Sequence, residues 1–279
     1  MKKKYLLVSL FCFLLLSAYA QHDIWKVGTA LTLPKGFYDV SVFEPTYMGV
    51  TPRLEISAQP WLFPVMPNFK IKRNWKKTDI YIATRHGIYY PSLALAIGKQ
   101  LGIDSTLTNT PKIPQMVCME HEILFSTWLI KPTNCHKGDA LLTLKIGLQT
   151  AFNSIENTMT YVYRPEIFPH GGVFADKLMW FVGLDLDGHY GTTMNYCIDF
   201  EFSKIVDSEN KLYEISHKGM FIMPLRTKKH RLVFGYKVFY DKYVNSSKFS
   251  FVPMVDFTWN LRKRTRTVPD GEIGDLYGF

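Results

Sequence analysis

Apolar and polar residues alternate with a period of two along most of this chain, in about twelve separate segments. A period of two places successive side chains on opposite faces of an extended strand. In residues 178–187 the even positions are apolar, whereas the odd positions include Gly183, Asp185 and Asp187, and residues 194–203 repeat this pattern. The pattern therefore predicts an all-β fold. The predicted strands are residues 25–32, 38–42, 54–58, 68–72, 79–85, 120–129, 140–148, 178–187, 194–203, 213–221, 231–241 and 249–261.

The alternation alone does not decide whether the apolar face lies in a protein core or against a membrane, because soluble sheets and membrane barrels both alternate. Segment length favours a membrane barrel: many segments run for ten residues or more, which a tilted membrane-spanning strand requires. Tryptophans also stand near segment ends, at positions 75, 128, 180 and 259, as the aromatic girdles of such barrels do.

The connections between the predicted strands give a third indication. The two longest, residues 87–115 and 154–173, follow the fifth and the seventh strand, while the even-numbered turns are shorter. Membrane barrels carry long external loops and short periplasmic turns, so both long connections are expected at the same rim. A soluble periplasmic β-sandwich is the alternative.

The first twenty residues have the composition of a secretory signal peptide. Lysines at positions 2–4 precede an apolar run over residues 5–16, and Ala18-Tyr19-Ala20 forms a small-x-small cleavage site. These features predict export. Removal of the three lysines leaves 30 basic residues against 24 acidic ones, a balance too mild to favour nucleic acid. The expected organisation is a signal peptide over 1–20, a barrel over 21–261 and a basic C-terminal tail over 262–279.

Together these residues resemble the bacterial outer-membrane β-barrel proteins as a broad class. The resemblance covers the signal peptide and nearly all of residues 25–261, and it rests on pattern rather than on a unique motif. Phe279, with Tyr277 two residues before it, is similar to the terminal aromatic signature of that class, although Asp275 and residues 269–271 depart from it. The resemblance implies an antiparallel transmembrane β-barrel of about 12 strands. Its expected partners are outer-membrane lipids, the barrel-assembly machinery and, for a channel, small solutes; no oligomeric state is indicated.

Catalytic motifs are missing from the sequence. There is no G-x-S-x-G, no G-x-x-x-x-G-K-[ST] and no H-E-x-x-H, and no histidine is followed two positions later by serine. His189, near Asp185 and Asp187, is the one histidine of interest, and its position beside a turn favours a rim residue. We therefore predict no catalytic residue, no cofactor and no metal. An outer-membrane lipid hydrolase, similar to a phospholipase or a lipid A deacylase, remains the enzymatic alternative.

Cysteine usage predicts no disulfide framework. Without Cys12 of the signal peptide, three cysteines remain, an odd number. Cys118 begins one predicted strand and Cys135 lies beyond its other end. The strand between them, over ~30 Å long, keeps them too far apart to pair.

Charged residues on the polar faces of the strands are the candidate functional residues, since parity directs them into the lumen. Two roles compete: the charges pair across a filled interior, or they face each other across water and sort small solutes by charge. Twelve strands lie between the filled and the open cases. The candidates are Arg53, Lys70, Lys72, Arg85, Asp185, Asp187, Asp199, Glu201, Arg231 and Lys237.

The connection over residues 87–115 contains an apolar segment that favours a helix. Ser92 can cap it after Pro91, and Gly98 or Gly102 can end it. An apolar helix needs a surface to bury against. We expect residues 92–101 to fold inward and narrow the lumen; the alternatives are packing on the outer rim or on the other long connection.

Overall fold

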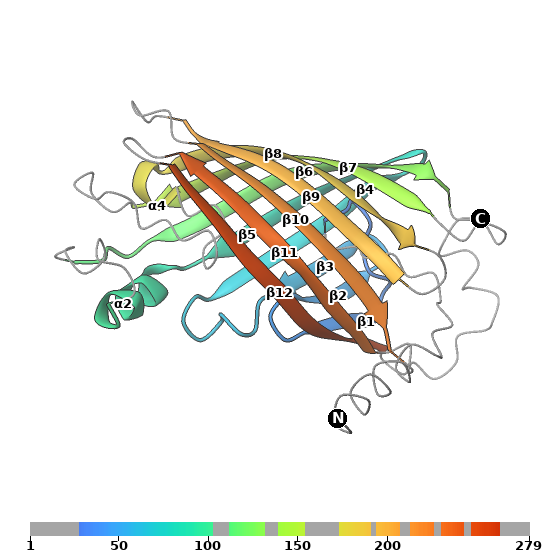
Figure 1. Ribbon diagram of the computed structural model, residues 1–279, viewed down its shortest axis with the longest axis horizontal. Coiled ribbons are helices and arrows are strands. Elements are labelled where there is room, and N and C mark those ends of the chain that lie inside the picture. The colour runs from blue at the N-terminus through green and yellow to red at the C-terminus, as the bar shows by residue number, and fades with distance from the viewer. Residues whose placement is uncertain are drawn as a thin grey trace, which may run out of the picture.

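The computed structural model describes residues 28–102, 112–131, 139–153, 173–190, 194–206, 213–225, 230–242 and 247–262. Twelve antiparallel strands form one closed barrel, in which each strand pairs with its neighbours in the sequence and β12 returns to β1 (Figure 1). The prediction of an all-β barrel of about twelve strands is therefore confirmed. The predicted signal peptide, Cys135 and the C-terminal aromatic residues lie outside the described residues.

The first three strands are short, with five residues in β1, and the longest strand is β12 with 16 residues. Among the described residues, the two long connections contain the helices α2 (Ser92–Gln100) and α4 (Val173–Asp176). The strands are β1 (Phe37–Ser41), β2 (Thr46–Thr51), β3 (Leu54–Ala58), β4 (Asn68–Lys77), β5 (Ile80–Tyr89), β6 (Val117–Ile130), β7 (Ala140–Phe152), β8 (Leu178–Tyr190), β9 (Met194–Ile205), β10 (Tyr213–Pro224), β11 (His230–Lys242) and β12 (Ser247–Arg262).

Closure depends on the pairing of β1 with β12, in which Phe37 is opposite Arg262 and Ser41 is opposite Thr258. A closed sheet has no unpaired edge strands. Two packed sheets would each keep edges, so the β-sandwich alternative does not apply to this chain.

The prediction of a first strand over residues 25–32 is wrong. Residues 28–33 are not part of the barrel wall, and residues 25–27 lie outside the described residues. The strand missing from the prediction is β2, which occupies Thr46–Thr51. Its inward positions are Tyr47, which is apolar, and Gly49, which has no side chain. Because both faces of β2 lack charge, the alternation that marks the other strands is absent there.

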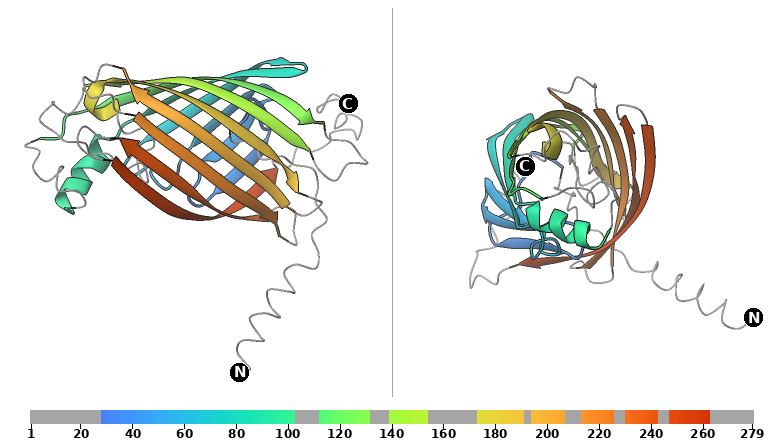
Figure 2. Two further views of the ribbon diagram at one scale, coloured as in Figure 1. Left: turned by 45° about the horizontal axis from the view of Figure 1, so that its top comes forward. Right: turned by 90° about the vertical axis from the view of Figure 1, so that its left-hand side faces the viewer.

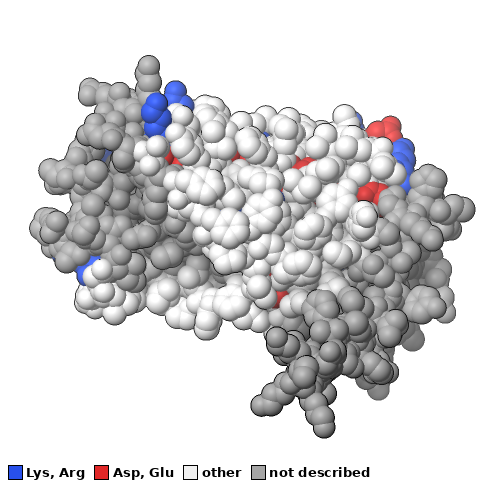
Figure 3. Space-filling model, in the orientation of Figure 1, with Lys and Arg blue, Asp and Glu red and all other residues white. Residues whose placement is uncertain are grey.

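The two faces of the wall differ in chemistry. Side chains on the outer face are predominantly apolar, and many are well exposed: Leu184 and Phe200 are each 49% exposed and Val255 is 64% exposed. Figure 3 shows the consequence: the surface over the strands is mostly white, and the larger groups of basic side chains lie towards the two ends. Inward side chains include most of the charged residues of the strands. This barrel is thus apolar outside and polar inside.

Among the described residues, no helix combines the length and the apolar character needed to cross a membrane.

The two rims of the barrel are distinct. We call the rim at Phe37 and Arg262 the terminal rim, and the opposite one, where β5 and β7 end, the loop rim. The connections β5–β6 and β7–β8 both leave from the loop rim, which is at the left in Figure 1, where α2 and α4 lie. The expectation that the two long connections share a rim is confirmed.

The predicted helix forms, and it lies at the mouth of the barrel at the loop rim rather than between the strands (Figure 2). Leu95 of α2 is fully buried in a cluster with Val173 and Phe174 of α4, the other long connection. The helix thus packs on the other long connection, which was one of the alternatives. We call this cluster the apolar cap; its buried members are Met66, Leu95, Met116, Cys118, Ala151, Val173, Phe174, Met179 and Ile205.

Ser92 has a different role from the expected one. Pro91 occupies the N-cap position, and no side chain caps the helix. The Ser92 hydroxyl instead accepts a hydrogen bond of 2.7 Å from the backbone N–H of Met116, which precedes β6. At the other end, Gly102 adopts a φ of 62°, a conformation that favours glycine after a helix. The side chain of Ser92 therefore links the helix to the backbone immediately before β6.

Candidate functional site

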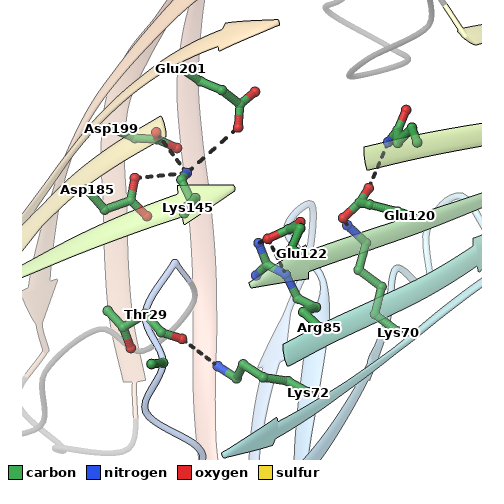
Figure 4. Close-up of polar contacts among 12 residues, drawn as sticks. Thr29, Lys70, Lys72, Arg85, Glu120, Glu122, Lys145, Asp185, Asp199 and Glu201 are labelled. Carbon is green, nitrogen blue, oxygen red and sulfur yellow. Dashed lines mark hydrogen bonds and ion pairs between the residues drawn. The ribbon is translucent and has the colours of Figure 1, made fainter. Parts of the chain in front are cut away.

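The interior of the barrel is organised around Lys145 on β7. Its Nζ lies 2.9 Å from carboxylate oxygens of both Asp185 and Asp199, and 3.9 Å from Glu201 (Figure 4). Lys145 is only 5% exposed, and Lys218 on β10 approaches Asp199 from its other side at 3.8 Å. Buried charges require partners to offset lost hydration. Four neighbouring strands thus supply a mutually compensating network, which we call the Lys145 cluster.

A second network spans β4 to β7. Arg85 donates to Glu122 from Nη2 at 2.6 Å and from Nε at 3.1 Å, the forked geometry that makes such pairs strong. The strand register explains this ion pair, because Arg85 and Glu122 are directly opposite each other in the β5–β6 ladder. Lys70 contacts Glu120 at 2.5 Å, and the Gln149 amide donates to the same carboxylate at 2.9 Å.

Residues 28–34, which we call the lumen segment, pass through the barrel interior near these networks. Lys72 links the wall to the segment, since its Nζ contacts Glu55 at 2.9 Å and donates to the Thr29 carbonyl at 3.3 Å (Figure 4). The other carboxylate oxygen of Glu55 accepts from the Leu33 N–H at 2.8 Å. One buried ion pair therefore holds both ends of this short stretch.

The middle of the lumen segment is bound equally closely. The Ala30 N–H donates to the Ser126 hydroxyl, and the Asn74 amide donates to the Ala30 carbonyl, each at 2.8 Å. Gly28 lies so close to Asp185 that an added Cβ would stand 1.8 Å from a carboxylate oxygen. The Asp185 carboxylate would have to move to admit a larger residue, and through Gly28 the segment touches the Lys145 cluster.

These contacts favour the first of the two roles considered for the lumen charges, the pairing of charges across the interior. An aqueous constriction exposes its charges to water, whereas Glu55, Lys72, Lys145 and Asp185 are each no more than 5% exposed. The charges pair with each other and with the lumen segment. At this level the charges of the described residues are therefore buried and paired, and the two helices of the apolar cap lie at the mouth of the barrel at the loop rim.

Nine of the ten candidate residues occupy inward positions in the strands. Arg231 contacts Asp39 at 3.4 Å, and the Lys237 ammonium stands 4.5 Å from the Phe239 ring centroid. Arg53 is the exception, because it lies exposed in the turn between β2 and β3. The structure brings Asp185, Asp199 and Glu201 together around Lys145. Lys70 and Arg85 belong to the second network, and Lys72 contacts the lumen segment. The inward nine are Lys70, Lys72, Arg85, Asp185, Asp187, Asp199, Glu201, Arg231 and Lys237.

Several important residues were not among the candidates. Lys145, Glu120 and Glu122 stand on the polar faces of their predicted strands, so parity alone was sufficient to find them. The lumen segment had no such signal, because residues 28–32 fell within the strand predicted over residues 25–32.

His189 pairs with a different acid from those adjacent in sequence. Its Nδ1 hydrogen-bonds the carboxylate of Asp139, which precedes β7, and its backbone N–H also donates to Asp139. The imidazole is buried at the terminal-rim end of β8. In the described part of the chain, no group of three or more His, Cys, Asp or Glu side chains is arranged to hold a metal ion. Cys118 and Cys197 are buried free thiols.

Comparison of the chain with protein-family models, with curated proteins and with solved structures finds no match. The class of this protein is therefore defined by its fold, a closed antiparallel barrel of twelve strands.

Proposed function

We propose that this chain is an integral β-barrel of a bacterial outer membrane, with a structural or partner-binding role and an interior that is closed at rest. The observation that carries the proposal is the apolar outer face of the closed barrel. Exposed apolar patches of soluble monomers rarely exceed a few hundred Å². A continuous apolar wall needs a nonpolar surrounding, and a bilayer supplies it.

Aromatic side chains at both rims support this location. Towards the loop rim, Trp180, Phe202 and Tyr213 lie side by side on the outer face. Towards the terminal rim, Phe257 packs against Trp259 at a centroid distance of 4.7 Å. Aromatic rings of this kind favour the two interfaces of a membrane.

The buried and paired charges of the interior support the closed state. The Lys145 cluster and the lumen segment occupy the middle, and the apolar cap covers the loop rim. A lipid hydrolase is less well supported, because the buried pair of His189 and Asp139 faces the interior, away from lipid.

A gated passage for small solutes is a second candidate function. Residues 28–33 pair with no strand of the described barrel and are held by hydrogen bonds with wall side chains. Each such bond contributes about 1 kcal/mol. Displacement of this segment therefore leaves the barrel wall itself intact.

The location is tested by fractionation of cells that express the full chain. We expect the protein in the outer-membrane fraction, and in detergent gels we expect the unheated protein to migrate differently from the boiled protein. An outer-membrane barrel of known behaviour serves as the control. Recovery in the soluble periplasmic fraction would falsify the proposal.

The closed state is tested separately, with refolded protein in liposomes that contain a small fluorescent solute. We expect leakage equal to that of empty liposomes. Rapid leakage would instead support an open channel.

A further inference from the structure

An aromatic strip crosses the outer face of four strands near the loop rim. Trp180, Phe202, Tyr213 and Tyr240 come from β8, β9, β10 and β11 respectively. Their ring centroids are separated by 5.5, 5.9 and 6.4 Å in that order. The strip is therefore continuous, with each ring in contact with the next.

Two lysines alternate with the rings of this strip. In the strand register, Lys204 is opposite Trp180 on one side and Tyr213 on the other, and Lys242 is opposite Tyr213 on its far side. The Lys242 Nζ stands 5.7 Å from the Tyr213 ring centroid. Strands are ~4.8 Å apart, so the two lysines flank Tyr213 with backbones about 10 Å apart. Their long side chains can converge on one group above that ring.

Neither lysine belongs to the networks of the interior. Ser203 and Ile205, on either side of Lys204, are buried towards the lumen, so Lys204 faces outward. Asp241, which precedes Lys242, and its cross-strand neighbour Glu214 face the lumen and are 2% and 7% exposed. The nearest acids on these strands therefore point away from the two ammonium groups.

This arrangement is confined to one sector of the rim. Among the described strand residues that face outward next to the loop rim, Lys204 and Lys242 are the only bases. Elsewhere the corresponding residues are uncharged, for example Phe69 on β4, Ile88 on β5, Val117 on β6 and Phe249 on β12. A general interfacial girdle would spread its basic residues around the barrel, so the pairing of two lysines around one tyrosine is a local feature.

We infer that this sector is a binding site for a phosphorylated lipid of the surrounding leaflet. The lipid phosphate binds between Lys204 and Lys242 over Tyr213, and the acyl chains lie along the exposed apolar side chains nearer mid-barrel, including Ile198, Phe200 and Phe221. Charge complementarity selects an anionic headgroup, and the apolar wall below it selects a lipid rather than a soluble phosphate. The inference rests on the proposed membrane location.

The test uses full-length mature protein in nanodiscs of phosphatidylcholine that contain a small fraction of phosphatidic acid. Lipids retained by the protein after detergent extraction are counted by native mass spectrometry. For the wild type we expect phosphatidic acid to be enriched over phosphatidylcholine. One lysine near the surface changes the affinity for an anionic lipid about fivefold, so Lys204→Gln with Lys242→Gln is expected to reduce the enrichment by roughly 25-fold.

Two matched variants serve as controls. Lys204→Arg with Lys242→Arg keeps both charges and is expected to retain the enrichment. Lys35→Gln with Lys76→Gln removes the same charge from exposed positions towards the terminal rim and is expected to behave like the wild type. All variants are first checked for heat-modifiable migration, so that only folded barrels are compared.

The outcomes separate this inference from the proposed function. A wild-type protein that enters nanodiscs but shows no preference for phosphatidic acid overturns the inference and leaves the membrane location standing. The same conclusion follows if the terminal-rim variant loses as much enrichment as the Lys204/Lys242 variant. A wild-type protein that folds in water and does not enter nanodiscs overturns both.

Discussion

At the scale of single residues, the electrostatics of the interior depend on a small number of basic side chains and on the carboxylates that they contact. Lys145 alone contacts Asp185, Asp199 and Glu201, and its side chain is almost completely buried. Removal of one partner from a buried ionic network leaves the remaining charges without compensation. A surface pair behaves differently, since water solvates both of its members whether or not they meet. The barrel contains both kinds, which permits a matched comparison.

Lys145→Met is expected to lower the free energy of unfolding by about 3–5 kcal/mol, because three carboxylates lose their common cation. The control is Lys131→Met, which removes an exposed lysine 3.5 Å from Asp79 and is expected to cost about 0–1 kcal/mol. Urea titration of refolded protein in liposomes measures both. Equal effects would show that the Lys145 cluster contributes no more than a surface pair.

At the scale of elements, two separate structures occupy the interior and the mouth of the barrel. The lumen segment is bound within the wall by Lys72, Asn74, Ser126 and Glu55. The apolar cap joins α2 to α4 at the loop rim, where the Leu95 side chain is fully buried. The lumen segment lies among the wall side chains and the apolar cap lies at the mouth, so the proposed closed state places two barriers in series.

Deletion of residues 28–33 together with residues 92–101 is expected to produce steady conductance in planar bilayers. Either deletion alone is expected to leave the conductance near that of the wild type, because the other barrier remains. Heat-modifiable migration confirms that each variant still forms a barrel. Conductance from the 92–101 deletion alone would show that the lumen segment does not seal the interior.

At the scale of the whole molecule, the distribution of polarity is the reverse of that in a soluble protein. Apolar side chains cover the outside of a closed wall, and charged side chains are buried inside it. In water, exposure of the apolar outer face would cost much free energy. In a bilayer that cost disappears, and the charged and polar groups buried in the interior need hydrogen-bond or ion-pair partners. The ion pairs of the interior meet that requirement.

Leu184→Lys places a charge on the outer face in the middle of β8. In a bilayer this substitution is expected to destabilise the barrel by about 2–4 kcal/mol, because lysine near the midplane is poorly solvated. Leu129→Lys, near the terminal-rim end of β6, is the matched control and is expected to cost about 0–1 kcal/mol. Urea titration in liposomes provides the measurement. If Leu184→Lys left the free energy of unfolding unchanged, this face of the barrel would be in contact with water.

The sequence alone was sufficient for most of the barrel wall. Alternation is a local property, because each residue in a strand faces opposite to the one before it. It therefore predicted eleven of the twelve strands and the inward position of nine of the ten candidate charges. It failed where the local pattern carried no charge, as in β2, and where a strand-like pattern belonged to a segment outside the wall, as in residues 28–33.

Only the tertiary structure decided what fills the barrel. Which carboxylate contacts Lys145, and which side chains bind the Ala30 backbone, depend on residues up to 96 positions apart in the chain. Likewise, the pairing of His189 with Asp139 and the alternation of Lys204 and Lys242 with two aromatic rings follow from strand register. A period of two fixes the face on which a residue lies. Its partner across the lumen or along the rim is set by closure and register, which no single segment encodes.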